Sequence, residues 1–214
     1  MAVKTFKEPI LLPKPTDTLA YFEAIKDLSN HYWQTIELDK ATYGFQIQKD
    51  SVWKKGLDAD EITLFEKELG YALPPPLYHF YRTMNGLDKQ GITLYGSSGH
   101  PYAYFPVFYS YPEDMAIIKE KIAWIYEEMQ VNEDDLLQRG ISRIFPICGH
   151  RFLLIDDSQH RILSMYGSDI VPWTDSLSKL LARSIFFRIA NKDDFANDHS
   201  FEDIVFWLDE PVVN

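Results

Sequence analysis

The chain has 214 residues, of which 46% are hydrophobic, a size that fits one large domain or one domain with an elaborated edge. Its net charge of −11 disfavours binding to nucleic-acid backbones and anionic membranes and favours basic partners. The single cysteine, Cys148, excludes an internal disulfide framework and is typical of a reducing compartment.

Targeting signals are not evident in the sequence. The N-terminal apolar run Ile10–Leu12 is too short for the core of a signal peptide and has Pro9 and Pro13 on either side. No stretch has the length of apolar residues needed to cross a bilayer. We therefore expect a cytoplasmic protein.

Negative charge is concentrated in two windows. Residues 113–135 contain eight acids and two bases, and residues 185–214 contain seven acids and two bases. Together these windows account for the whole net charge of −11. They are either solvated helix faces that serve solubility or surfaces that bind a basic partner.

Residues 1–57 are predicted to form an N-terminal extension packed on the main domain. Apolar residues recur at helical spacing between Thr16 and Trp33, and either Thr16 or Asp17 is placed to cap that helix. A strand-like or irregular stretch follows at 43–53.

Residues 58–86 predict two short helices around a proline corner. Asp58 and Glu61 have the spacing of a capping box, and Gly70 can adopt the left-handed conformation that ends a helix. Three prolines at 74–76 then begin a second helix, whose apolar residues lie three, four and seven positions apart. Asn85-Gly86 is expected to end this helix, since both residues tolerate positive φ.

The remainder predicts an antiparallel sheet with further helices. Strands are expected at 92–95, 102–109, 144–147, 152–155 and 161–165, with a loop at 96–101. Helices are expected at 112–130, after Asp175 with Leu177, Leu180, Leu181 and Ile185 facing inward, and at 201–208 with Ser200 and Asp203 as its capping pair. The fold class is therefore α+β, a mostly antiparallel sheet flanked by helices in a single domain at 58–185, with an acidic C-terminal extension at 186–214.

The segment from Ile62 to Gly86 resembles the signature of the SUKH superfamily. The matching features are an acid in the first helix (Glu66), Gly70, Leu73-Pro74, an aromatic-rich helix with Tyr78 and Phe80, and Asn85-Gly86. The similarity extends over roughly 58–185. It implies a non-enzymatic binding domain: bacterial members resemble immunity proteins that neutralise polymorphic or contact-delivered toxins, often nucleases, and fungal members resemble scaffolds in cell-wall synthesis and signalling.

Catalytic signals are weak by comparison. Cys148-Gly149-His150 invites a nucleophile or metal hypothesis, but no metal-ligand spacing accompanies it, and a hairpin turn is the favoured interpretation. Asp156 and Asp157 are adjacent, which suits a turn better than a carboxylate pair, and Gly96–Gly99 lacks the lysine of a phosphate loop. We predict no catalytic residue, cofactor or metal.

The acidic window at 113–135 is the predicted partner-binding site. Its acids are Glu113, Asp114, Glu120, Glu127, Glu128, Glu133, Asp134 and Asp135. The leading hypothesis is an immunity protein whose acids, with those of the C-terminal tail, occlude the active site of a basic toxin domain. The alternatives are a regulatory or scaffolding domain with a cellular protein partner and, third, an enzyme built on Cys148 and His150.

Overall fold

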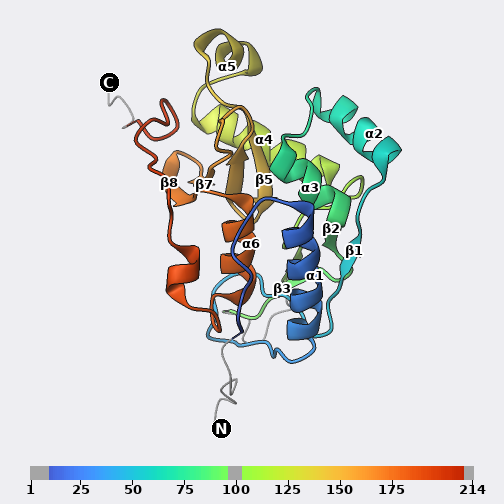
Figure 1. Cartoon of the computed structure of the whole chain (residues 1–214). Coiled ribbons are helices and arrows are strands. Elements are labelled where there is room, and N and C mark those ends of the chain that lie inside the picture. The colour runs from blue at the N-terminus through green and yellow to red at the C-terminus, as the bar shows by residue number, and fades with distance from the viewer. Residues whose placement is uncertain (1–9, 96–102, 210–214) are drawn as a thin grey trace.

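The computed structural model describes residues 10–95 and 103–209 (Figure 1); the predicted loop at 96–101 lies outside these ranges. Its helices are α1 (Leu19–Trp33), α2 (Ala59–Leu69), α3 (Pro75–Thr83), α4 (Met115–Glu128), α5 (Glu133–Arg139) and α6 (Leu177–Phe186), with a 3-10 turn η1 (Lys192–Phe195). Its strands are β1 (Trp53–Lys55), β2 (Met84–Leu87), β3 (Gly91–Thr93), β4 (Ala103–Phe105), β5 (Ile144–Cys148), β6 (Arg151–Leu154), β7 (Ile162–Tyr166) and β8 (Asp169–Thr174).

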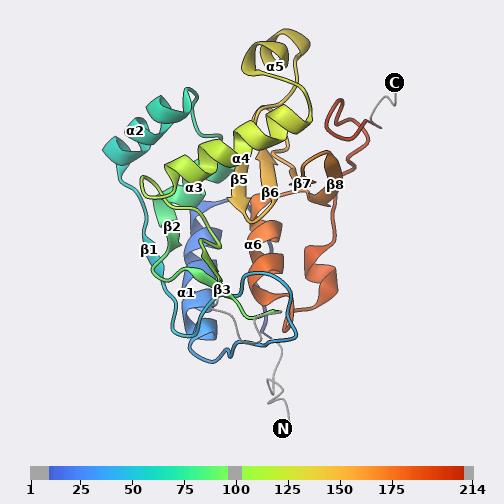
Figure 2. The same ribbon diagram turned by 180° about the vertical axis from the view of Figure 1, so that it is seen from behind.

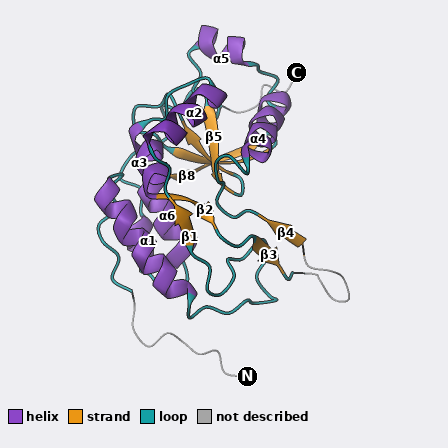
Figure 3. Cartoon of the chain, turned by 90° about the vertical axis from the view of Figure 1, so that its right-hand side faces the viewer, coloured by secondary structure: helices purple, strands orange, loops and turns teal. Residues whose placement is uncertain are grey.

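Strands β5 to β8 form a four-stranded antiparallel sheet in sequence order. Because successive side chains point to opposite faces, Leu153 packs with the cluster of α1, α3 and α6, whereas Phe152 packs with Ile125 of α4. Figure 3 shows α4 on one side of this sheet and α1, α3 and α6 on the other. Burial on both faces explains the nearly continuous apolar runs of these strands. The predicted α+β class is confirmed.

The corner between α2 and α3 forms as predicted. The Asp58 carboxylate accepts from the backbone N–H groups of Asp60 and Glu61, and the Glu61 carboxylate accepts from the Asp58 backbone N–H. Gly70 ends α2 at φ 82°, and Pro75 begins α3. Local caps and turns thus determine both helix ends here.

The segment after α3 differs from the prediction that Asn85-Gly86 ends a helix. Helix α3 stops at Thr83, and Met84–Leu87 is the buried strand β2, paired with β1. Trp53 lies opposite Leu87 and Lys55 opposite Met84, so β2 has one extra residue in this pairing. Gly86 lies in this bulge with φ 71°. Its tolerance of positive φ therefore serves a strand bulge and not the end of a helix.

Two further expectations are corrected. Thr18, rather than Thr16 or Asp17, caps α1, and the Asp17 carboxylate instead accepts from the Ser178 N–H at 2.7 Å at the start of α6. The predicted helix at 201–208 is a series of turns, in which Trp207 packs into the core beneath α4 while Asp203 binds Arg161.

Helix α4 has the predicted apolar stripe, with Met115, Ile118 and Ile125 buried and Ile122 and Met129 partly buried. Strand β8 and helix α5 were not anticipated. In α1, Phe22 and Ile25 are fully buried in the same cluster as α3 and α6. The division into extensions and a main domain stays a prediction.

Candidate functional site

Helix α4 turns a row of acids away from the sheet. Its buried residues Met115 and Ile125 face the core, and Figure 2 shows the helix lying across the outside of the molecule. The acids at positions 120, 127 and 128 are spaced so that they share one helical face, and all three are exposed. The Glu128 carboxylate accepts from the indole N–H of Trp124 at 3.3 Å. Within the described ranges, no hydrogen bond or ion pair engages the carboxylates of Glu120 and Glu127.

The two acids before α4 have structural partners. The Asp114 carboxylate accepts from the Ser110 backbone N–H at 2.8 Å and from its hydroxyl at 2.7 Å. Glu113 lies 3.7 Å from the Lys54 ammonium. These contacts hold the turn that leads into α4, so both carboxylates have partners within the protein.

Helix α5 projects from the body of the protein (Figure 1) and displays two more acids. Asn132 and Asp135 form a capping box at its start, which ties Asp135 to the backbone. Glu133 and Asp134 are exposed and, in the part of the chain described, have no ion-pair partner. The sequence carried a usable signal for this helix, since Asn132 and Asp135 have capping-box spacing and Gly140 ends it.

An apolar residue accompanies these acids. Leu137 of α5 is 84% exposed, whereas its neighbour Leu136 is buried. The α4–α5 acidic surface is defined here as the exposed acids Glu120, Glu127, Glu128, Glu133 and Asp134 together with Leu137. It combines charge that can attract a basic partner with one large apolar side chain that can be buried on contact.

Acids of the C-terminal segment are partly used to tether it. Asp198 binds the Lys179 ammonium at 2.8 Å, and Asp203 binds the guanidinium of Arg161, which is 3% exposed. Hydrogen bonds from these bases lower the pKa of both carboxyl groups. Asp198 and Asp203 therefore stabilise the path of the segment along the domain.

Cys148 and His150 have different neighbours in the structure. Burial raises the pKa of the Cys148 thiol to about 11, and its Sγ lies 3.8 Å from the Ser184 hydroxyl. The His150 ring instead packs edge-on against Tyr166. Across residues 10–95 and 103–209, no group of three histidine, cysteine, aspartate or glutamate side chains is arranged to hold a metal.

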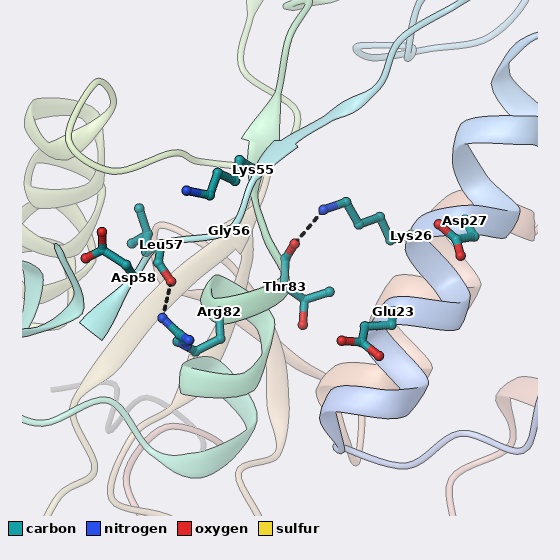
Figure 4. Close-up of a pocket in the computed structure, with 9 residues that line it drawn as sticks. All are labelled: Glu23, Lys26, Asp27, Lys55, Gly56, Leu57, Asp58, Arg82 and Thr83. Atoms are coloured by element: carbon teal, nitrogen blue, oxygen red, sulfur yellow. Dashed lines mark hydrogen bonds between the residues drawn. The ribbon is translucent and has the colours of Figure 1, made fainter. Parts of the chain in front are cut away.

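A hollow of about 660 Å³ lies between α1 and the junction of β1 with α3 (Figure 4). Lys26 crosses it to donate to the Thr83 carbonyl at 2.8 Å, and Arg82 donates to the Leu57 carbonyl at 2.7 Å. Charged side chains of both signs line it, unlike the mostly apolar pockets that enclose small molecules. Two of its cations, Lys26 and Arg82, therefore join α1 to α3 and α3 to the segment after β1.

Comparison with known proteins identifies the scaffold. The model of the SMI1 / KNR4 family (SUKH-1) matches residues 56–210. The chain belongs to this family. The SUKH-1 match confirms the resemblance seen in the sequence and extends to 210, past the predicted boundary at 185. Neither the curated proteins nor the solved structures contain a match to this SUKH-1 chain.

The SUKH-1 signature residues have structural roles in this protein. The Glu66 carboxylate accepts from the Leu73 backbone N–H at 2.8 Å, which joins α2 to the proline corner. The Asn85 side chain donates to the Tyr111 carbonyl at 2.6 Å and accepts from its N–H at 2.8 Å. The signature therefore defines the SUKH-1 scaffold, and function must be sought on its surface. Among the described residues, none of the helices is long and apolar enough to traverse a bilayer.

Proposed function

We propose that this SUKH-1 protein is a cytoplasmic immunity protein that binds a basic toxin domain and occludes its active site. Family membership supports a protein-binding role, either in immunity or in regulation. The proposal of a toxin partner rests on one further observation, the α4–α5 acidic surface, whose acids are exposed and largely unpaired.

The chemistry of that surface suits a positively charged cleft. Complementary charge accelerates encounter and orients the two proteins, whereas the tightness of a complex comes from a few desolvated anchors. Leu137, 84% exposed at the tip of the molecule, is the proposed anchor, and the neighbouring acids Glu133 and Asp134 are the proposed contacts to toxin lysines and arginines. Filling a nuclease cleft in this way would exclude its nucleic-acid substrate.

We also propose that the protein acts without catalysis. A cysteine nucleophile reacts as the thiolate, and burial keeps the Cys148 thiol protonated at neutral pH. The His150 ring packs on Tyr166, whereas the Cys148 thiol lies against the Ser184 hydroxyl.

The test is protection of cells that express a candidate basic toxin, chosen from the genes adjacent to this one. Wild-type protein should restore growth, and the double variant Glu127→Lys with Asp134→Lys should lose most protection because it reverses charge at the contact. The control is Glu23→Lys with Asp27→Lys, which makes the same charge change at exposed sites on α1, on the opposite side of the molecule from α4 (Figures 1 and 2).

Three results would discriminate the hypotheses. Failure of the wild-type protein to protect would overturn the immunity role and leave the regulatory alternative. Protection by wild type that both double variants lose equally would remove the α4–α5 surface as the contact. A Cys148→Ala variant that protects fully would dispose of an enzyme built on Cys148 and His150.

A further inference from the structure

Trp173 of β8 is stacked between two arginines. The guanidinium carbon of Arg151 lies 3.5 Å from the centre of the Trp173 ring, and that of Arg183 lies 3.8 Å from it. Carbon atoms in contact are separated by about 3.5 Å, so two guanidinium groups at these distances cannot share one face of the ring. Arg151 from β6 and Arg183 from α6 therefore cover opposite faces of Trp173.

Neither arginine has an acidic partner. Arg151 donates to the Ser164 hydroxyl, and Arg183 donates to the Trp173 carbonyl at 3.5 Å. Each guanidinium carries five N–H donors, so most donors of this pair are unused. No carboxylate of the described ranges forms a salt bridge with either. Burial lowers the pKa of both groups, and for Arg151 the charge of Arg183 lowers it further.

Two other arginines of the protein do have acidic partners. Arg143 binds Asp156, and Arg161 binds both Asp157 and Asp203. The chain has 32 acids for 21 lysines and arginines, so acidic partners are plentiful. Two half-buried arginines that lie together without an acidic partner carry a local positive charge, which an anion would neutralise.

The donor pattern continues around the ring. The indole N–H of Trp173 is covered and has no acceptor within the described residues. The Ser164 hydroxyl is bonded to Arg151. The Ser184 hydroxyl, next to Arg183 in sequence, lies 3.8 Å from the Cys148 Sγ. The site is therefore rich in donors and poor in acceptors, which is the composition of an oxyanion site.

We propose that Arg151, Trp173 and Arg183 form a binding site for a phosphate-type dianion. The two guanidinium carbons lie on opposite faces of one ring, about 7 Å apart, so an oxyanion at the edge of the ring is attracted by both charges. A phosphate monoester carries nearly two negative charges at neutral pH and matches both arginines, whereas a carboxylate neutralises only one. The ligand is a free phosphate compound or a phosphorylated side chain of a partner.

Isothermal titration calorimetry with inorganic phosphate, O-phosphoserine and acetate tests this proposal on the full chain. Inorganic phosphate and phosphoserine represent the two sources. We expect saturable binding of at least one of them, weakened about tenfold or more in Arg183→Gln because a charge-assisted fork is lost. Arg183→Lys should bind with intermediate affinity, since it keeps the charge but loses the fork.

The matched control is Arg139→Gln. Arg139 is an exposed arginine that stacks on Phe206, so the variant removes one charge and one aromatic contact elsewhere, and affinity should change less than about twofold. Binding of phosphoserine but not phosphate supports a phosphorylated partner. The proposal is overturned if wild type binds neither dianion, if acetate binds as tightly as they do, or if Arg139→Gln weakens binding as much as Arg183→Gln. Arg151→Gln provides a second test should Arg183→Gln fail to fold, as judged by circular dichroism.

Discussion

At the scale of single residues, Asn85 is a buried polar side chain that joins two segments of the fold. It is 6% exposed and satisfies both the N–H and the carbonyl of Tyr111, thereby joining β2 to the turn before α4. We expect Asn85→Ala to lower the free energy of unfolding by about 2–4 kcal/mol, because two buried backbone groups lose their partner. Urea denaturation measures this; the exposed amide variant Gln138→Ala should change stability by less than about 0.5 kcal/mol.

The ion pair between Asp157 and Arg161 makes stability depend on pH. Burial raises the pKa of Asp157, but hydrogen bonds from the side chain and backbone of Arg161 outweigh it, so the pKa lies below its ordinary value. A carboxyl group whose pKa is lowered by folding contributes stability above its unfolded pKa of about 4 and loses it as pH falls through the folded value.

We therefore predict that Asp157→Asn destabilises the protein at pH 7 by about 2–3 kcal/mol, since Arg161 stays buried with only Asp203 to neutralise it. As pH falls from about 4 through the lowered pKa of folded Asp157, the difference between wild type and variant should shrink, because protonation of this carboxyl group removes the wild type's advantage. Thermal unfolding of both proteins between pH 3 and 7 checks this. A difference that stays constant across that range would contradict the assigned pKa direction.

At the scale of elements, the contact of β1 with the end of α3 requires a glycine. A Cβ added at Gly56 would lie 2.1 Å from the Arg82 carbonyl oxygen, and the adjacent Leu57 N–H donates to the Tyr81 carbonyl at 2.8 Å. The two backbones are therefore too close for any side chain.

Gly56→Ala should cost about 3 kcal/mol or more, because backbone must move on both sides. The matched control is Gly140→Ala at the end of α5, where φ is +63° but a Cβ meets no atom within 4 Å. That variant should cost only about 1–2 kcal/mol, the conformational penalty alone. Equal losses in urea denaturation would show that crowding at Gly56 is relieved by movement of the strand.

The α2–α3 corner has strong local signals and agrees with its prediction, whereas segments decided by distant contacts do not. The Asp58 capping box and Gly70 specify α2 through neighbours in sequence. Strand β2 contains Asn85-Gly86, which locally favours a turn, yet pairing with β1 and the bond to Tyr111 make it a strand. The turns at 201–208 form because Asp203 reaches Arg161, 42 residues away, which no helical period reveals.

At the scale of the whole molecule, the net charge of −11 should govern association with a basic partner. If the proposed function holds, surface plasmon resonance should show an on-rate that falls about tenfold or more between low and physiological salt, because screening shortens the range of attraction. The off-rate should change much less. An on-rate that does not respond to salt would count against steering by the α4–α5 acidic surface while leaving the binding role intact.

The sequence by itself determined the α+β class, the α2–α3 corner, the inward faces of α4 and α6 and the family, because these follow from caps, turns and apolar periods that act over a few residues. It also placed the acids of the 113–135 window. Only the tertiary structure decided which of those acids are engaged within the protein. The Asp114 and Asp135 carboxylates accept from backbone N–H groups, whereas Glu127 and Asp134 are exposed to solvent. The tertiary structure also decided the position of Arg151 and Arg183, which are 32 positions apart in sequence and stack on Trp173. The packing of α6 on the sheet, and not a local sequence pattern, brings these side chains from three elements together.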